Sequence, residues 1–372
     1  MKVTLGLTHQ CNLACSYCYA GRSTKPDMSL STAQKCIDFA LETLPAGKHL
    51  GLCLFGGEPL LRFDLVREIT TYTYQKANEA EKTVQISITT NGTLVTPSEI
   101  DFAADQNIHL CFSVDGPPDL HDRKRAYHNG RGSFDNVMRR LELALKRLDT
   151  VQVNAVFGPD TIMDLPRCLK FFVDFGIPVI HLNPDITATW PNDLRPKLQD
   201  VYNQLAEYYI GSYTQGHEIA INLLDSKMVL FIKGGYDVTD MCAMGDGEWG
   251  FAPSGNIYPC ERFIGEDENS QYCLGSIHTG LDLERRCALR LQRGNHNPVC
   301  CACNFNKYCM NWCGCTNYFM SGRSDMPAPV LCAMEQATIQ AARHVFDSLV
   351  NAGNDLFADH MYNYVNAGIH HR

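Results

Sequence analysis

Near its N-terminus the chain reads Cys11-Asn12-Leu13-Ala14-Cys15-Ser16-Tyr17-Cys18. Three cysteines at this spacing neither complete a tetrahedral zinc site nor supply the four thiolates that a four-iron cluster normally takes. One position of a bound cluster would stay open, and an open iron can bind the substrate of a redox reaction. The stretch therefore predicts a catalytic metal site, with a zinc site completed by His9 or a distant cysteine as the alternative.

Short β-branched runs alternate with longer amphipathic stretches up to about residue 185, a pattern typical of βα units around a parallel sheet. We predict strands over residues 2–8, 50–55, 84–89, 109–113, 151–157 and 179–183. We predict helices over residues 31–44, 63–79, 134–147 and 163–175, the first capped by Ser29 or Ser31. These six units predict an α/β fold, a partial (β/α)6 TIM-like barrel whose chemistry lies where strands end.

A second cysteine cluster lies near the C-terminus. Its pattern is Cys242-x12-Gly255-x4-Cys260, then Cys300-x2-Cys303-x5-Cys309-x3-Cys313, then Cys332. The surrounding loops are rich in Cys, Gly and Asn, as expected where metal ligation substitutes for a hydrophobic core. We therefore predict a barrel domain over 1–185, a helical bridge over 186–239, a metal-binding domain over 240–335, and a terminal helix with a weakly packed tail over 336–372.

Composition narrows the class of protein. The chain holds 18 cysteines among 372 residues, too few and too clustered for a disulfide scaffold. No signal peptide precedes Cys11, so we expect a cytoplasmic location in which thiols bind metals. The net charge of −9 gives no basic surface for nucleic acid, and no apolar run is long enough to span a membrane.

The first cysteine motif resembles that of the radical S-adenosylmethionine (SAM) superfamily. This resemblance implies a [4Fe-4S] cluster held by Cys11, Cys15 and Cys18, whose open iron chelates SAM and whose electron cleaves it to a 5'-deoxyadenosyl radical. It also implies that SAM is bound by residues of the loops after the first four strands. These are Tyr17 beside the adenine, Gly56, Gly57, Glu58 and Pro59 of a GGEP loop, Thr90 and Asn91 of a TNGT loop, and Ser113 and Asp115 of an SxDG loop.

An HDxxR segment follows, His121-Asp122-Arg123-Lys124-Arg125. Arg123 or Arg125 can hold a carboxylate of SAM or the substrate backbone by a bidentate fork, and we assign Arg123. A solvated basic loop is the alternative.

The second cluster resembles the SPASM domain, which carries two auxiliary iron-sulfur clusters in related peptide maturases. The resemblance implies an outer [4Fe-4S] cluster on Cys300, Cys303, Cys309 and Cys332. It implies an inner [4Fe-4S] cluster on Cys242, Cys260 and Cys313, so that the chain would hold three clusters. The fourth ligand of the inner cluster stays open among Cys273, Cys301, Cys315 and none. Structural zinc is the alternative for these motifs.

Auxiliary clusters favour net oxidation of a substrate, because they offer a path for the electron that a product radical must lose. We predict a maturase that crosslinks side chains of a ribosomally synthesised peptide. The alternative is an enzyme resembling the anaerobic sulfatase-maturating enzymes, which form formylglycine from Cys or Ser. Glu261, directly after Cys260, is the candidate base that takes the departing proton. An alternative from a different functional class is a non-catalytic iron-sulfur electron carrier or a zinc-binding scaffold.

The expected partners follow from this reaction. They are a peptide or protein substrate and a low-potential electron donor. Many peptide maturases carry an N-terminal leader-binding domain, whereas this chain begins on its first predicted strand. Leader binding would therefore reside in a separate protein or be dispensed with.

Overall fold

The structure is a computed structural model that describes residues 1–21, 24–237, 240, 242–268, 271–291, 297–309 and 313–366. The described chain forms two compact units, each built from segments far apart in the sequence. Unit 1 comprises Met1–Ser113, Asp122–Val151 and Ala243–Gln292. Unit 2 comprises Val114–His121, Gln152–Cys242 and Arg293–Arg372.

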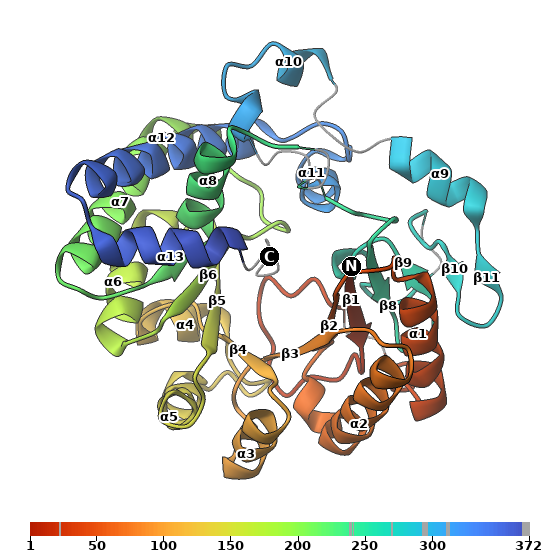
Figure 1. The fold of residues 1–372 in the computed structure, drawn as a ribbon. Coiled ribbons are helices and arrows are strands. Elements are labelled where there is room, and N and C mark those ends of the chain that lie inside the picture. Colours follow the sequence, from red (N-terminus) through yellow and green to blue (C-terminus); the bar gives the residue numbers. More distant parts are fainter. Residues whose placement is uncertain are drawn as a thin grey trace. The chain divides into compact units, whose positions relative to one another are not determined.

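Unit 1 contains a mostly parallel sheet (Figure 1). Its strands are β1 (Lys2–Gly6), β2 (Leu50–Phe55), β3 (Val84–Thr90), β4 (His109–Ser113), β8 (Glu248–Phe251) and β9 (Ile257–Tyr258). Their order is β4-β3-β2-β1-β8-β9, and β9 alone of these six runs antiparallel to its neighbour. A separate hairpin pairs β10 (Gly275–Ser276) with β11 (Gly280–Leu281). The helices of the unit are α1 (Leu30–Thr43), η1 (Pro59–Arg62), α2 (Phe63–Glu79), α3 (Pro97–Asp105), α5 (Phe134–Leu145), η4 (Glu261–Phe263) and α9 (Leu283–Leu291).

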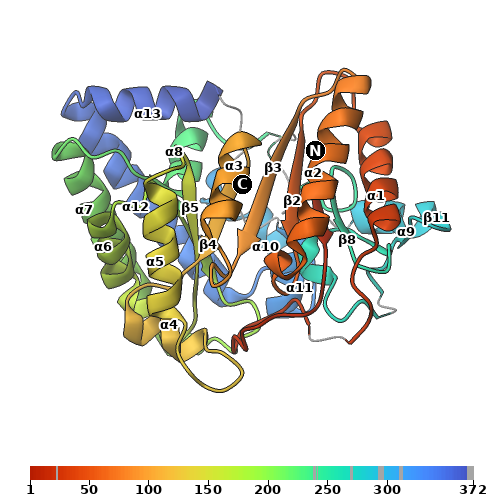
Figure 2. The ribbon, with the colours of Figure 1, turned by 90° about the horizontal axis from the view of Figure 1, so that it is seen from below.

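Alternation along the strands of unit 1 separates a core face from a polar face, because successive side chains point to opposite sides of a sheet. Leu52 and Leu54 of β2 are almost fully buried, as is Ile88 of β3, whereas Cys53 and Thr89 between them are half-buried. Helices α1 and α2 lie side by side along the sheet (Figure 2). Each fully buried aliphatic side chain stabilises the fold by roughly 1.5–3 kcal/mol, so this core holds the strand ends in place.

Unit 2 holds three parallel strands in the order β5-β6-β7, followed by a helical layer. The strands are β5 (Val151–Phe157), β6 (Val179–Pro184) and β7 (Ala220–Ile221). The helices are η2 (Ile162–Asp164), α6 (Leu165–Phe175), η3 (Asn192–Lys197), α7 (Leu198–Thr214), α8 (Asn222–Lys233), α10 (Pro298–Cys301), η5 (Asn306–Tyr308), α11 (Gly314–Ser321), α12 (Pro329–Asn351) and α13 (Asp355–Asn366). The short helix α4 (Pro118–Lys124) runs from residues of unit 2 into residues of unit 1. Helix α12 packs along α7 and α8.

The predicted α/β fold class is confirmed, with all six predicted strands present. Those over 50–55, 109–113 and 151–157 have the predicted bounds, and the others differ by at most two residues at an end. Ser29 caps α1, since its side chain accepts a hydrogen bond from the N–H of Thr32. The predicted domain boundaries at 185, 239 and 335 stay a prediction.

Among the elements that were not predicted are α3, β8 and α13. Helix α3 begins at a capping box formed by Thr96 and Glu99. Strand β8 lies in the region predicted as loops, yet it pairs with β1. Helix α13 occupies most of the predicted weakly packed tail, and it buries Phe357 and Met361 almost completely. The prediction of a weakly packed tail was wrong, because α13 has an apolar face that is buried. Residues 367–372 lie outside the described residues.

Among the residues that the structure describes, no helix is both long enough and apolar enough to cross a bilayer.

Candidate functional site

The loop after β1 carries the first cysteine trio. Cys11 and Cys15 are half-buried and Cys18 is exposed. The Cys11 sulfur accepts from the backbone N–H of Leu13 at 3.4 Å. Burial raises the pKa of Cys11 to about 11, and the negative charges of Glu58 and Cys15 add to the rise. Closely placed thiols whose protons a metal must displace fit a thiolate-ligated iron cluster.

The glycine pair at the end of β2 lets the cysteine loop approach the sheet. A Cβ on Gly56, whose φ is +135°, would lie 2.4 Å from the Thr8 carbonyl oxygen, and one on Gly57 would lie 2.2 Å from that of Gln10. The N–H groups of Gly57 and Glu58 donate to the carbonyls of Thr8 and Gln10 at 2.7 and 2.9 Å. Only glycine fits here, so these two residues fix where the cysteine loop starts.

Glu58 has a different environment from the one predicted. The sequence indicated a carboxylate offered to a ligand, but Glu58 is 0% exposed. Its carboxylate accepts from the N–H of Leu60, the hydroxyl of Thr90 and the N–H of Asn91, at 3.0, 2.7 and 2.7 Å. A buried carboxylate needs such donors. Glu58 therefore joins the ends of β2 and β3.

Asn91, after β3, holds the cysteine loop from the other side. Its amide donates to Asn12 Oδ1 at 2.9 Å and lies 3.7 Å from the Cys11 sulfur. The Asn12 amide in turn donates to the hydroxyl of Thr93 at 2.8 Å. The TNGT loop thus supports the loop that carries the cysteines.

The predicted SxDG residues fall in different units. Ser113 ends β4 in unit 1 and is half-buried. Asp115 belongs to unit 2, where it is 6% exposed and accepts from the N–H of Val156 at 3.0 Å. Its own N–H donates to Nδ1 of His121 at 3.3 Å. Asp115 therefore organises the turn after β4 within unit 2.

Of the two candidate arginines, Arg125 lies beside the cysteine loop. It is 7% exposed, and its Nη1 donates to the Tyr17 hydroxyl at 2.5 Å, with the guanidinium 5.9 Å from the centre of the Tyr17 ring. Its charge also lowers the pKa of Glu58 against the effect of burial. Arg123, which the sequence assigned, is exposed on α4. The motif contained both arginines, and no sequence pattern distinguished them.

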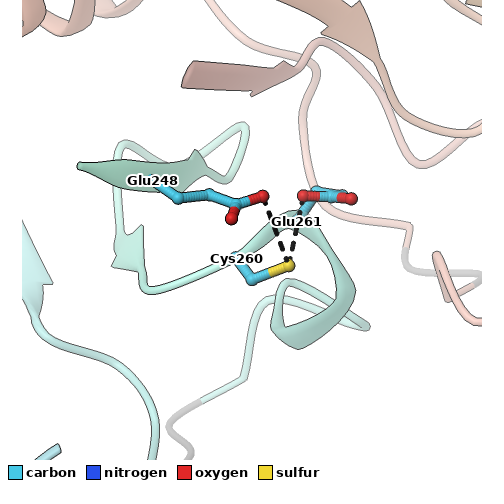
Figure 3. Close-up of side chains that lie close together, drawn as sticks. All are labelled: Glu248, Cys260 and Glu261. Atoms are coloured by element: carbon cyan, nitrogen blue, oxygen red, sulfur yellow. Dashed lines mark hydrogen bonds between the residues drawn. The ribbon is translucent and has the colours of Figure 1, made fainter. Parts of the chain in front are cut away.

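Glu261 lies in a cluster with Glu248 and Cys260 (Figure 3). The Cys260 thiol donates to Glu261 at 3.2 Å and lies 4.0 Å from a Glu248 oxygen. The Lys2 ammonium lies 3.4 Å from the Glu248 carboxylate and 3.9 Å from that of Glu261. Lys2 and Glu248 are register partners on β1 and β8. The sequence gave no signal for either of them, because their proximity depends on the unpredicted strand β8.

The electrostatics keep Glu261 ionised. Burial opposes its charge, but the Lys2 ammonium and the Arg262 guanidinium hold the pKa of Glu261 below its usual range. Glu261 in turn is the largest cause of the raised pKa of Lys2. Glu261 also lines a small pocket, together with Thr8, His9, Ala20, Phe55, Gly56 and three further residues. The ionised carboxylate of Glu261 therefore lies beside the loops that follow β1 and β2.

Four cysteines of unit 2 match the predicted outer set. Cys300 is buried, and the Asn297 side chain donates to its sulfur at 3.1 Å. Burial raises the pKa of Cys332, and the negative charges of Cys300 and Cys303 raise it further. Cys309 is also buried. An all-cysteine donor set of this kind fits a [4Fe-4S] cluster.

The predicted ligands of the inner cluster fall in both units. Cys242 and Cys313 belong to unit 2, and Cys260 belongs to unit 1. The Cys313 sulfur lies 3.4 Å from the Cys315 sulfur and 3.2 Å from the Thr316 hydroxyl. Of the three spare thiols, Cys315 is therefore beside a predicted ligand. Cys273 contacts the carbonyl of Gly275 at 3.4 Å, and Cys301 is exposed. Residues 310–312 of the motif lie outside the described residues.

A parallel α/β sheet with a cysteine trio after its first strand is the arrangement expected of an iron-sulfur enzyme that uses SAM. Residues 5–172, a little under half of the chain, match the Radical SAM superfamily, and this match supports an enzyme that uses SAM and a [4Fe-4S] cluster. The match favours an enzyme over the alternative of a non-catalytic scaffold.

One relative and two solved structures show what the chain is similar to. It is 24% identical to the cysteine-type anaerobic sulfatase-maturating enzyme of Clostridium novyi (strain NT), over 82% of this chain and 84% of the relative. Its fold resembles native anSMEcpe with bound AdoMet, with a TM-score of 0.79 and 19% identity over 95% of this chain and 99% of the other. It also resembles Streptococcus suis SuiB bound to precursor peptide SuiA, with a TM-score of 0.61 and 16% identity over 89% and 75%. These structural likenesses establish the fold.

Proposed function

We propose that this chain oxidatively modifies side chains of a ribosomally synthesised peptide, most simply by crosslinking two of them, and that it does so with two auxiliary [4Fe-4S] clusters besides the first. The observation that carries this proposal is the Lys2-held carboxylate of Glu261, directly after a predicted auxiliary-cluster ligand and on the wall of the pocket near the cysteine loop. A redox-neutral isomerisation would need neither a base nor auxiliary clusters at this place.

In this proposal the first cluster, together with SAM, would supply the radical that removes one hydrogen atom from the peptide. Cys11, Cys15 and Cys18 hold that cluster, and the GGEP and TNGT loops fix their loop. We assign the carboxylate of SAM to Arg125 in place of Arg123, because Arg125 is the buried cation beside Tyr17. Pairing a buried guanidinium with a carboxylate is favourable and directional.

Glu261 then takes the proton that leaves the peptide. An electron must leave as well, and the cysteines of the C-terminal motifs would hold the clusters that accept it. Crosslinking two side chains in this way removes two hydrogens in total, one as the abstracted atom and one as a proton plus an electron. The atoms and charges of the proposed reaction therefore balance.

A second candidate function is formation of formylglycine on a sulfatase. The Clostridium novyi relative, matched over most of both chains, favours it. By the resemblance to the sulfatase-maturating enzymes, Glu261 stands where those enzymes carry an aspartate, and this difference weakens the formylglycine candidate. We therefore favour peptide crosslinking.

The proposal is tested by anaerobic reconstitution with iron and sulfide, followed by reaction with dithionite, SAM and a peptide encoded beside the gene. Crosslinking predicts a peptide that has lost two hydrogens, resists fragmentation between the joined residues and does not react with a hydrazide probe. A hydrazide-reactive aldehyde on a sulfatase peptide would support formylglycine formation instead. Unmodified peptides of both kinds would contradict the proposed function.

A further inference from the structure

A buried lysine lies next to the loop of the predicted outer cluster. Lys227 on α8 is 1% exposed, and its ammonium lies 2.6 Å from a carboxylate oxygen of Glu335 on α12. The same ammonium donates to the backbone carbonyl of Tyr308 at 3.2 Å and lies 3.5 Å from the Tyr236 hydroxyl. A lysine is almost never fully buried unless it is paired, so this position calls for an explanation.

The partners of Lys227 are adjacent to predicted cluster ligands. Tyr308 directly precedes Cys309, and Glu335 follows Cys332 by three residues, about one turn of α12. One ammonium therefore joins the loop that carries Cys309 to the helix that carries Cys332. All of these residues belong to unit 2.

Further contacts bring the same loop close to α8. The N–H of Tyr236 donates to the carbonyl of Lys307 at 3.1 Å. A Cβ on Gly235, whose φ is +124°, would lie 2.7 Å from the Lys307 side chain, so glycine permits this approach. The Tyr308 ring packs edge-on against Phe231 at 5.2 Å, and the Arg343 guanidinium lies 3.6 Å from the centre of the Phe231 ring.

We propose that Lys227 is a positioning residue for the outer auxiliary cluster: its ammonium fixes the backbone at Tyr308 so that Cys309 is held toward the ligands Cys300, Cys303 and Cys332. This inference rests on the proposed auxiliary clusters. Groups that hydrogen-bond to metal ligands and orient them typically increase metal affinity by about 10- to 100-fold. Glu335 compensates the buried charge of Lys227, whereas the bond to the Tyr308 carbonyl orients the loop.

Four variants separate this role from mere stabilisation by a buried ion pair. K227M removes both the pair and the donor to Tyr308. E335Q keeps the lysine and its bond to Tyr308. K227M/E335M removes both charges together, which is often neutral for stability, but leaves Tyr308 without its donor. C300A provides the iron content and the electron paramagnetic resonance spectrum of a chain that lacks the outer cluster.

The measurements are iron per chain, the spectrum of the reduced protein, the rate of cluster loss to a chelator, and the melting temperature. We expect K227M and the double variant to lose the C300A-sensitive cluster about 10- to 100-fold faster than wild type, while uncoupled SAM cleavage by the first cluster persists. We expect E335Q to keep the rate of cluster loss near that of wild type while its melting temperature falls, because the buried Lys227 charge loses its partner. A further variant, K227R, keeps a cation and should lose the cluster more slowly than K227M.

The inference would be overturned if K227M lost the cluster faster than wild type while the double variant retained it normally. Lys227 and Glu335 would then only compensate each other's charge. Retention in both variants would overturn the inference as well. If wild type and C300A held the same iron, the auxiliary-cluster proposal itself would fail, and the inference with it. Substrate conversion enters none of these readouts, so the two failures can be told apart.

Discussion

Two arginines that differ by two positions have opposite environments in this protein. Arg125 is buried against Tyr17 and bonds to its hydroxyl, whereas Arg123 is exposed on α4. The sequence motif contains both arginines and cannot show which of them lies beside the cysteine loop. That depends on which side chain the end of the short helix α4 directs toward the loop. This pair offers a matched test of the site.

We expect R125Q to raise the KM for SAM by about 10- to 100-fold, since a hydrogen bond to a charged group contributes roughly 1.5–3 kcal/mol. R123Q serves as the control and should leave the KM within about twofold, as for exposed ion-pair residues. Initial rates of 5'-deoxyadenosine formation over a range of SAM concentrations provide the measurement. Equal effects of the two substitutions would refute the assignment of Arg125.

Glu261 is the residue for which the reaction proposal makes its sharpest claim. We expect E261Q to keep forming 5'-deoxyadenosine while the modified peptide falls by about 10²- to 10⁴-fold, the usual contribution of a general base. E261D retains a carboxylate and should keep a larger share of product. The ratio of modified peptide to 5'-deoxyadenosine is the measurement. A normal ratio in E261Q would show that another group takes the proton.

At the scale of the element, glycines position the first cysteine loop. A side chain on Gly57 would meet the Gln10 carbonyl at 2.2 Å, whereas one on Gly211 in α7 meets nothing nearer than 4.0 Å. We expect G57A to displace the loop and to lose the first cluster, with about four fewer iron atoms per chain. G211A should be neutral or stabilising by about 0.5–1 kcal/mol. Full iron content in G57A would contradict this account of the GGEP loop.

Helix α13 is attached to unit 2 through His360. Its Nδ1 lies 2.9 Å from Glu218 and its Nε2 lies 3.3 Å from the buried Asp225, which also accepts from Tyr209 at 2.5 Å. Burial opposes the imidazolium charge, but Asp225 and Glu218 raise the pKa of His360 from 6.5 to about 9. The charged pair stabilises the folded state, and the sign of its pH dependence follows.

Because the folded-state pKa is raised, this contribution is fully present below about pH 6.5 and is lost as the pH rises through about 9. It amounts to something on the order of 3 kcal/mol. Urea unfolding at pH 6 and pH 9.5 should show the loss in wild type and not in H360Q. H344Q is the control, because His344 and Glu207 form an exposed pair that contributes little. The same pH dependence in H360Q would assign the effect to other groups.

The elements that the sequence predicted well are those with a strong local pattern. The β-branched run 151–157 and the apolar run 50–55 have their predicted bounds, because burial on the core face dictates their residue types. Strand β8 was missed because Glu248–Phe251 has one polar end and two aromatic residues, and only its pairing with β1 makes it a strand. The contacts of Lys2 with Glu248 and Glu261, and of Lys227 with Tyr308, arise from pairing and packing that no local spacing records.

At the scale of the whole molecule, the two cysteine clusters divide the proposed work. The trio after β1 has the loop support and buried cation that a SAM-binding cluster needs, and it lies within the region that matches the Radical SAM superfamily. Cys300, Cys303 and Cys332 all belong to unit 2, where the proposed electron acceptor would reside. Radical generation and electron removal would therefore depend on separate sets of ligands.

The most direct measurement compares wild type with the variant C11A/C15A/C18A after anaerobic reconstitution. With dithionite and SAM, we expect wild type to form 5'-deoxyadenosine and methionine and to hold about twelve iron atoms in three clusters. The variant should form neither product while it keeps about eight iron atoms. SAM cleavage that survives in the variant, or a colourless wild type that holds zinc and cleaves nothing, would contradict the account.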